Sequence, residues 1–234
     1  MSVIKVKNEL KALKNPEKIA VFDNFFKTGK GQYGEGDEFY GLTAQEIKDV
    51  AKKYQDIDLT EVLTLLKDKV HEVRMAALRI LVHKYKKGDD KQKKQVFDIY
   101  LKNTKYINNW DLIDVTTPDI VGDYLLKRDR AVLYKLARSK SLWEKRISML
   151  ATYTFIRNKE FEDTLKIAEI LLADDHDLIH KAVGWMLREV GNRDREVEEL
   201  FLRKYYQKMP RTMLRYAIEK FPESLRQKYL KGEM

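Results

Sequence analysis

The chain contains no cysteine. Disulfide bonds, a thiolate metal site and a cysteine nucleophile are therefore all excluded, and a reducing interior compartment fits this composition. The N-terminal stretch MSVIKVKNELKALKN lacks an unbroken apolar segment followed by a small-residue cleavage site. We therefore expect a cytoplasmic protein rather than a secreted one.

Long apolar runs, proline and glycine are also scarce. No stretch approaches the ~18 apolar residues that a membrane-spanning helix needs, so we expect no membrane association. The 234 residues include 4 prolines and 10 glycines, which leaves long segments free to form helices, and 44% of the residues are hydrophobic. That content is enough to bury a core in one elongated domain or two small ones, and it excludes a disordered chain.

Apolar residues recur at helical spacing, as in residues 62–70 and 73–81, where they fall at i, i+3, i+4 and i+7. No segment shows the alternation of a strand. Helix start and stop signals recur along the chain: capping boxes at Thr43, Asp58 and Ser141, a first-turn proline at Pro118 and a stop at Gly191. The pattern predicts an all-α fold.

The helices are expected to come in pairs joined by short loops. The predicted pairs are 59–87, 91–116, 118–139, 142–172 and 177–208. Residues 73–85, 145–157 and 180–190 each begin with basic residues and continue as an apolar helix face. This repetition predicts one HEAT-like or armadillo-like helical repeat solenoid over residues 1–234, with a concave basic groove. An irregular helical bundle without a groove is the alternative.

The formal charge of +9, from 46 Lys and Arg against 37 Asp and Glu, is a modest excess. Its placement is more informative, because from Arg193 to the end cations recur through helical segments beside aromatic residues. A basic stripe with aromatic neighbours can follow a phosphate backbone, although lysine and arginine stems also cover core edges.

Residues 28–37, TGKGQYGEGD, form a glycine-rich insert between helical segments. The insert contains a literal G-x-G-x-x-G from Gly29, but no strand precedes it and no βαβ unit surrounds it, so a dinucleotide site is excluded. It is not a P-loop either. We expect a mobile loop; the alternative is that Lys30 and the bare backbone approach a ligand phosphate.

The four histidines give no metal motif. His176 and His180 lie four residues apart in HDLIH rather than HExxH, and no third ligand is evident. His71 and His83 resemble ordinary helix residues. We therefore expect no metal and no cofactor, and the chain also lacks a G-x-S-x-G or other nucleophile signature.

Each of the three tryptophans has a charged residue on the same helix face. Asp114 follows Trp110 at i+4, and an arginine follows each of the others at i+3, in the pairs Trp143–Arg146 and Trp185–Arg188. If these faces converge, one site holds electron-rich rings, a carboxylate and phosphate-binding guanidinium groups. The alternative is that the tryptophans are core residues, since large aromatics dominate helical cores.

The chain resembles the AlkD family of DNA alkylation repair glycosylases, which are built from HEAT-like repeats. The stretches that carry the resemblance are NNWDLIDVTTPDIVGDYLLK (109–127), SLWEKRISML (141–150) and HKAVGWMLREV (180–190), and the segment 15–43 also looks like the family's N-terminal region. These motifs place tryptophan, aspartate and arginine together at separate points along nearly the whole chain.

The resemblance implies a role for individual residues. Trp110 and Trp185 match the family's active-site tryptophans, and Asp114 matches its catalytic aspartate. Arg146 matches the arginine that holds the DNA backbone beside the lesion. Where some members have an active-site tyrosine, this chain has Phe25 and Phe26, so a ring remains but no hydroxyl, which bears on substrate preference more than on the reaction.

An N3- or N7-alkylated purine is positively charged and can leave its deoxyribose as a neutral base. Aromatic faces attract such a cation, and a carboxylate such as Asp114 can oppose the charge that develops on the sugar and position the attacking water. With no evident nucleophilic amine, hydrolysis should leave an abasic site without cutting the strand. The family resembled grips the backbone and sugar without enclosing the base.

The resemblance therefore implies a monofunctional glycosylase acting on duplex DNA as a monomer, in the cytoplasm at the nucleoid. Two alternatives stay open. One is a non-catalytic HEAT-like DNA- or RNA-binding paralogue, and the other is a protein-interaction scaffold, the commonest use of helical repeats.

Overall fold

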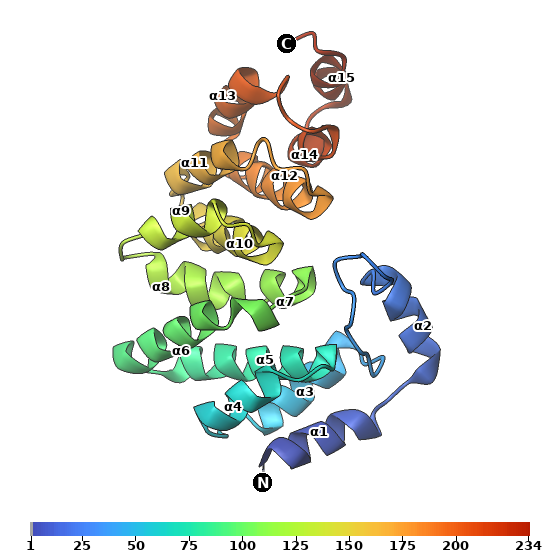
Figure 1. Ribbon diagram of the computed structural model, residues 1–234. Helices are drawn as coiled ribbons and strands as arrows, with labels where there is room; N and C mark the ends of the chain where they lie inside the picture. Colours follow the sequence, from blue (N-terminus) through green and yellow to red (C-terminus); the bar gives the residue numbers. More distant parts are fainter. Residues whose placement is uncertain (1) are drawn as a thin grey trace. The chain divides into compact units, whose positions relative to one another are not determined.

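The computed structural model describes residues 2–234, which are helical throughout apart from their connections (Figure 1). Among these residues the only β-type pairing is an isolated parallel bridge between Glu38 and Val70. Residue contacts divide the chain into two compact units, one up to Thr116 and the other from Thr117 onwards. No helix of the described part combines the length and apolar character needed to cross a membrane. A single domain over the whole chain stays a prediction.

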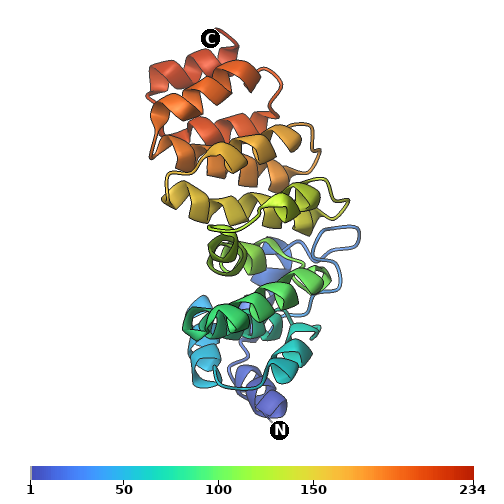
Figure 2. The ribbon, with the colours of Figure 1, turned by 90° about the vertical axis from the view of Figure 1, so that its left-hand side faces the viewer.

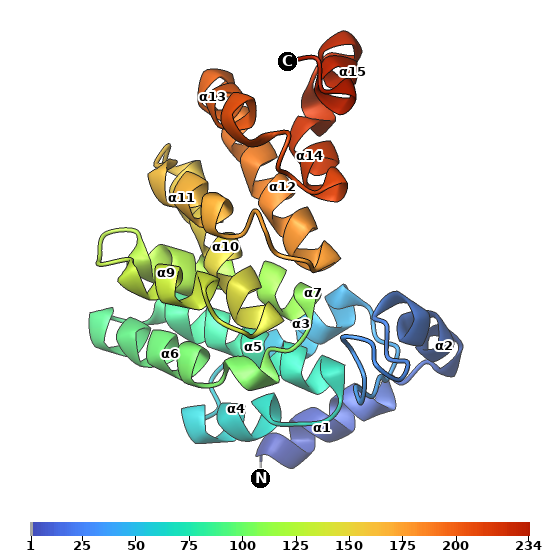
Figure 3. The same ribbon diagram turned by 45° about the horizontal axis from the view of Figure 1, so that its top comes forward.

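The first unit is built around the long helix α5 (His71–Lys87). The other helices of this unit are α1 (Ser2–Ala12), α2 (Pro16–Phe25), α3 (Ala44–Lys53), α4 (Leu59–Leu66), α6 (Asp90–Lys102), η1 (Thr104–Tyr106) and α7 (Trp110–Asp114). Figure 3 shows α1, α3 and α4 gathered against α5, which also contacts α6 and α7. Because α5 has neighbours on several sides, most of its residues are buried, including charged ones.

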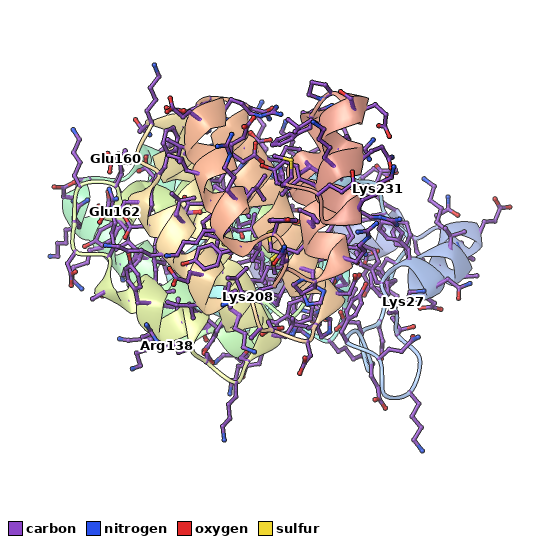
Figure 4. All side chains as sticks on the ribbon, turned by 90° about the horizontal axis from the view of Figure 1, so that it is seen from above. Lys27, Arg138, Glu160, Glu162, Lys208 and Lys231 are labelled. Atoms are coloured by element: carbon purple, nitrogen blue, oxygen red, sulfur yellow. The ribbon has the colours of Figure 1, made fainter. Side chains whose placement is uncertain are left out.

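The second unit stacks helices in layers (Figure 2). Its elements are η2 (Pro118–Gly122), α8 (Asp123–Leu125), α9 (Ala131–Ala137), α10 (Leu142–Arg157), α11 (Glu162–Ile170), α12 (Asp177–Gly191), α13 (Arg195–Tyr205), α14 (Arg211–Ala217), η3 (Ile218–Lys220) and α15 (Glu223–Lys231). Helix α10 packs on α9, α11 and α12, and α12 packs in turn on α13 and α14. Charged side chains such as Arg138, Glu160 and Glu162 project outward from this stack (Figure 4).

The all-α helical repeat fold predicted from the sequence is confirmed. The predicted helix pairs coincide with successive helices of the structure, and the three segments that share a basic start and an apolar face lie in α5, α10 and α12. These helices have packing partners on several sides. In α5 and α10 the buried residues accordingly extend around more of the helix than those of a surface helix, whereas in α12 they keep to one face.

The predicted capping boxes form to different degrees. Thr43 forms a complete box with Glu46, in which each side chain accepts the other residue's backbone N–H. Ser141 accepts the N–H of Glu144, whose carboxylate instead accepts the Ser139 hydroxyl. Asp58 is the N-cap residue of α4, as predicted, but the capping box there is wrong, because its side chain makes no capping hydrogen bond. Helix α12 ends at Gly191, as predicted.

Candidate functional site

A largely apolar pocket of about 250 Å³ lies in the first unit, between α2, α3, α5 and the start of α7. Its polar lining is confined to a few side chains among many apolar ones. The pocket is lined by Phe22, Phe25, Phe26, Leu42, Thr43, Ala44, Ile47, His71, Glu72, Met75, Arg79, Trp110 and Asp111. Ligand sites in proteins commonly have this composition, an apolar wall with a small number of placed polar groups.

The structure brings three of the predicted site residues together at this pocket. The ring of Trp110 stacks on that of Phe26, with 5.7 Å between centroids, and meets the ring of Phe25 edge-on at 5.5 Å. Phe26 is buried, whereas Phe25 keeps 58% of its surface exposed. The buried ring of Phe26 therefore packs against one face of Trp110, and the exposed ring of Phe25 extends the aromatic surface towards solvent.

Helix α7 carries both Trp110 and Asp114, and the first unit holds it at its N-terminal end and in its middle. Asn109 caps the helix by accepting the Trp110 N–H at 2.8 Å. Leu112 and Ile113 in the middle of the helix are fully buried. Trp110 and Asp114, one turn apart, are both half-buried. The core thus anchors the middle of α7 and leaves its two predicted catalytic side chains partly open to solvent.

A buried histidine of the pocket lining, His71, joins α7 to the glycine-rich segment. Nε2 of His71 lies 2.8 Å from a carboxylate oxygen of Asp111, and Nδ1 lies 3.4 Å from Asp37. The imidazole packs against the rings of Phe26 and Phe39, each with its centroid 4.9 Å away. His71 is 2% exposed, so its polar atoms depend on these two carboxylates for partners.

The charges around His71 are balanced. Burial lowers the pKa of His71, but the charge and hydrogen bond of Asp111 and the hydrogen bond of Asp37 outweigh burial and raise this pKa to about 9. Burial raises the pKa of Asp37, yet its bonds to His71 and to Arg74, 2.7 Å away, lower it overall. At neutral pH the network therefore pairs two cations, His71 and Arg74, with two carboxylates, Asp37 and Asp111.

The predicted loop 28–37 is a chain of turns held by its own hydrogen bonds. Gly34 donates to the carbonyl of Lys27 at 3.0 Å, and a side chain at Gly34 would lie 2.3 Å from the Phe26 carbonyl oxygen. Lys27, at positive φ, is exposed where α2 ends (Figure 4), and Lys30 is exposed further along the loop. The contact of Lys30 with a ligand phosphate stays a prediction.

The remaining predicted site residues belong to the second unit. Trp143 and Trp185 are half-buried, and the ring of Trp185 lies 6.1 Å from that of Tyr153. Arg146 is 4% exposed, and its guanidinium group donates to the Leu178 carbonyl at 2.6 Å. These residues sit on the long helices α10 and α12, as predicted. Their convergence with Trp110 and Asp114 on one groove stays a prediction.

Arg188, the last predicted DNA contact, forms an ion pair with Glu219.

The two histidines with metal-like spacing, His176 and His180, bond protein groups. His176 accepts the Leu178 N–H as the N-cap of α12, and His180 bonds the Asp174 carbonyl. Within residues 2–234, no group of three or more His, Asp or Glu side chains is arranged to hold a metal ion.

Sequence reasoning missed the network of His71, Asp37 and Asp111. It treated His71 as an ordinary helix residue, which is wrong, because His71 is the first residue of α5 and is almost fully buried between two acids. The two carboxylates lie 34 and 40 residues from it along the chain. No local spacing pattern connects residues that far apart, so only the tertiary structure reveals the contact.

The fold and the site together define an all-α helical repeat protein. Its pocket combines tryptophan, phenylalanine and carboxylate side chains. The family model for DNA alkylation repair enzymes matches residues 6–221. The chain therefore belongs to the DNA alkylation repair enzyme family and has a role in DNA alkylation repair.

Comparison with solved structures gives the same fold. A predicted DNA alkylation repair enzyme from Enterococcus faecalis is similar with a TM-score of 0.68 at 14% identity, over 90% of this chain and 97% of that one. The comparison with curated proteins yields no match.

Proposed function

We propose that this chain is a DNA glycosylase that hydrolyses the N-glycosidic bond of positively charged N3- or N7-alkylated purines in duplex DNA. The observation that carries the proposal is α7, which holds a half-buried tryptophan and a half-buried aspartate one turn apart. Trp110 lines the aromatic pocket, and Asp114 follows it outside the pocket lining. Membership of the DNA alkylation repair enzyme family supports it.

The residue types suit the chemistry of a cationic base. Trp110 and Phe25 offer aromatic surface to the cationic nucleotide, an attraction of about 0.5–2 kcal/mol per ring. When the glycosidic bond breaks, its electron pair leaves with the base, which becomes neutral, and positive charge develops on the deoxyribose. Asp114 opposes that charge and orients a water, whose oxygen bonds to the anomeric carbon while one proton is lost to solvent. The products are a free base and an abasic site.

The second unit supplies Trp185 as a further aromatic surface in this proposal. Trp143, together with Lys30 of the first unit, contributes contacts to the DNA backbone. Arg146, which is 4% exposed and bonded to the Leu178 carbonyl, and Arg188, which is paired with Glu219, contribute contacts only by exchanging these partners for phosphate. The substrate is duplex DNA, bound by a monomer at the nucleoid. No metal or cofactor takes part, because the departing base is already a good leaving group.

The test is base release from duplex DNA that contains N7-methylguanine. We expect the wild-type protein to produce abasic sites, scored by alkaline strand cleavage, and Asp114→Asn to slow release by about 100-fold or more, because the amide cannot oppose the developing charge. Asp56→Asn makes the same chemical change at an exposed aspartate of the same unit and should leave the rate unchanged.

Three outcomes would contradict the proposal. Tight duplex binding with no release from N7-methylguanine or N3-methyladenine would favour a non-catalytic DNA-binding paralogue. Release of an uncharged base such as hypoxanthine as fast as N7-methylguanine would contradict selection by charge. Failure to bind duplex DNA at all would favour a protein-interaction scaffold.

A further inference from the structure

The residues that hold Trp110 in place converge on one side chain that the proposed reaction does not use. His71 bonds Asp111, the second residue of α7, and Asp37 at the end of the glycine-rich segment. Its ring also packs on Phe26, which stacks on Trp110. One buried imidazole therefore contacts the helix that carries the tryptophan, the ring beneath the tryptophan and the loop beside it.

We propose that His71 is a positioning residue, which fixes the start of α7 through Asp111 and thereby sets the orientation of Trp110 towards the substrate. This inference rests on the proposed function. Helix α7 is a single short turn-and-a-half, and its N-terminal end has two side-chain anchors, the Asn109 cap and the Asp111–His71 bond. Loss of one anchor leaves the end of α7 that carries Trp110 held by the other.

The cost of the network argues for a role beyond filling space. Burying ionised groups carries a desolvation penalty that apolar residues of the same volume avoid. Here the chain buries His71 and Arg74 and compensates them with Asp37 and Asp111, drawn from the loop and from α7. Both ring nitrogens of His71 have carboxylate partners, while Nε of Arg74 has none. The two bonds of His71 therefore specify where α7 lies relative to α5.

The first test follows Trp110 directly and does not depend on catalysis. In a Trp143→Phe/Trp185→Phe protein, Trp110 is the sole tryptophan. We expect its fluorescence to change between pH 7 and 9.5 as His71 loses its proton, since the pKa of His71 is raised to about 9. His71→Gln should remove the transition. Asp111→Asn should move its midpoint to lower pH, because a carboxylate that favours the imidazolium is lost.

The second test measures catalysis with the full chain. We expect His71→Gln to lower the single-turnover rate of N7-methylguanine release by about 10- to 100-fold, as a small misplacement of a reacting group does, while the Kd for undamaged duplex changes by less than about twofold. His83→Gln, on the partly exposed part of the same helix, should not alter the rate. Adding Asp111→Asn to His71→Gln should cost little more, because both break the same link.

The outcomes separate the two proposals. If the wild-type protein releases no base but Trp110 fluorescence titrates with His71, the glycosylase proposal fails and the positioning of Trp110 stands. If the wild type releases base, and His71→Gln keeps both the rate of release and the pH-dependent change of Trp110 fluorescence, the positioning role is wrong. Should His71→Gln unfold, Asp111→Asn decides the question, because it keeps the buried ring and removes the charge of the carboxylate that His71 bonds; an unchanged rate and midpoint would overturn the inference.

Discussion

Glu198 is a buried acid of the second unit with little to stabilise its charge. Its side chain lies on α13 against Gly191 at the end of α12, and it is 2% exposed. One carboxylate oxygen has no hydrogen-bond partner. Burial raises the pKa of Glu198 to about 8, against the lowering effect of Arg195 and Arg188. The folded second unit therefore holds this acid largely protonated at neutral pH.

This raised pKa predicts that the protein loses stability as pH rises from 5 to 9. The folded state keeps the proton up to about pH 8, whereas the unfolded state releases it near 4.5. Between these values the folded state binds more protons, so the stabilisation present below pH 4.5 is lost progressively as pH rises through 8. Glu198→Gln should remove up to ~4 kcal/mol of this pH dependence, at ~1.4 kcal/mol per pKa unit.

Urea unfolding at pH 5.5 and 8.5 measures the effect. The control is the wild type at both values, because His71, with its own raised pKa, contributes a loss of stability between about 6.5 and 9 in both proteins. An identical pH dependence in Glu198→Gln and wild type would show that Glu198 is ionised in the folded state.

Helices α12 and α14 pack closely because a glycine allows their backbones to approach. A side chain at Gly184 would lie 2.4 Å from the Met213 carbonyl oxygen and 2.5 Å from Cβ of Tyr216. This glycine lies one position before Trp185, within the HKAVGWMLREV motif. The close approach of α14 therefore constrains α12 at the position next to Trp185.

We expect Gly184→Ala to destabilise the protein by about 1–3 kcal/mol, the usual effect of overpacking. Alanine favours a helix over glycine by about 1 kcal/mol, but it meets backbone here, and backbone cannot move aside as a side chain can. Thermal unfolding measures the change. Gly29→Ala is the matched control, because the added methyl group there meets only the end of the flexible Gln32 side chain; an equal loss at both positions would contradict the packing argument.

The two compact units divide the predicted site residues between them. The first carries Trp110, Asp114 and the phenylalanines, and the second carries the other tryptophans and the arginines. The net charge of the chain is +9. Proteins that contact duplex DNA through several phosphates release counterions, and their affinity falls steeply with salt.

For duplex DNA we therefore expect affinity to fall roughly 100-fold or more between about 50 mM and about 200 mM salt, with a log–log slope of about −0.9 per phosphate contacted. Fluorescence anisotropy of a labelled duplex measures this slope. Lys30→Ala should reduce its magnitude by about one contact, whereas Lys48→Ala, exposed on α3, should not. Affinity that barely responds to salt would favour a largely apolar peptide as the partner.

Local sequence patterns were sufficient to predict the helices. Helical spacing of apolar residues identified α5, α10 and α12, and Thr43 marked the start of α3. Local sequence patterns failed to predict side-chain bonds where a residue distant in the chain binds the predicted partner. Asp58 occupies the N-cap position of α4 without a capping hydrogen bond, and Glu61, its predicted capping partner, accepts the N–H of Ser2, 59 residues away.

The sequence by itself therefore determined the fold class, the helix pairs and the motifs that mark the family, because these depend on hydrophobic periodicity and on residues close together in the chain. Only the tertiary structure decided what surrounds each motif. The stacking of Trp110 on Phe26 and the clamping of His71 between Asp37 and Asp111 join residues 34 to 84 positions apart. Contacts at that range arise from how α2, α5 and α7 pack, and no local pattern encodes that packing.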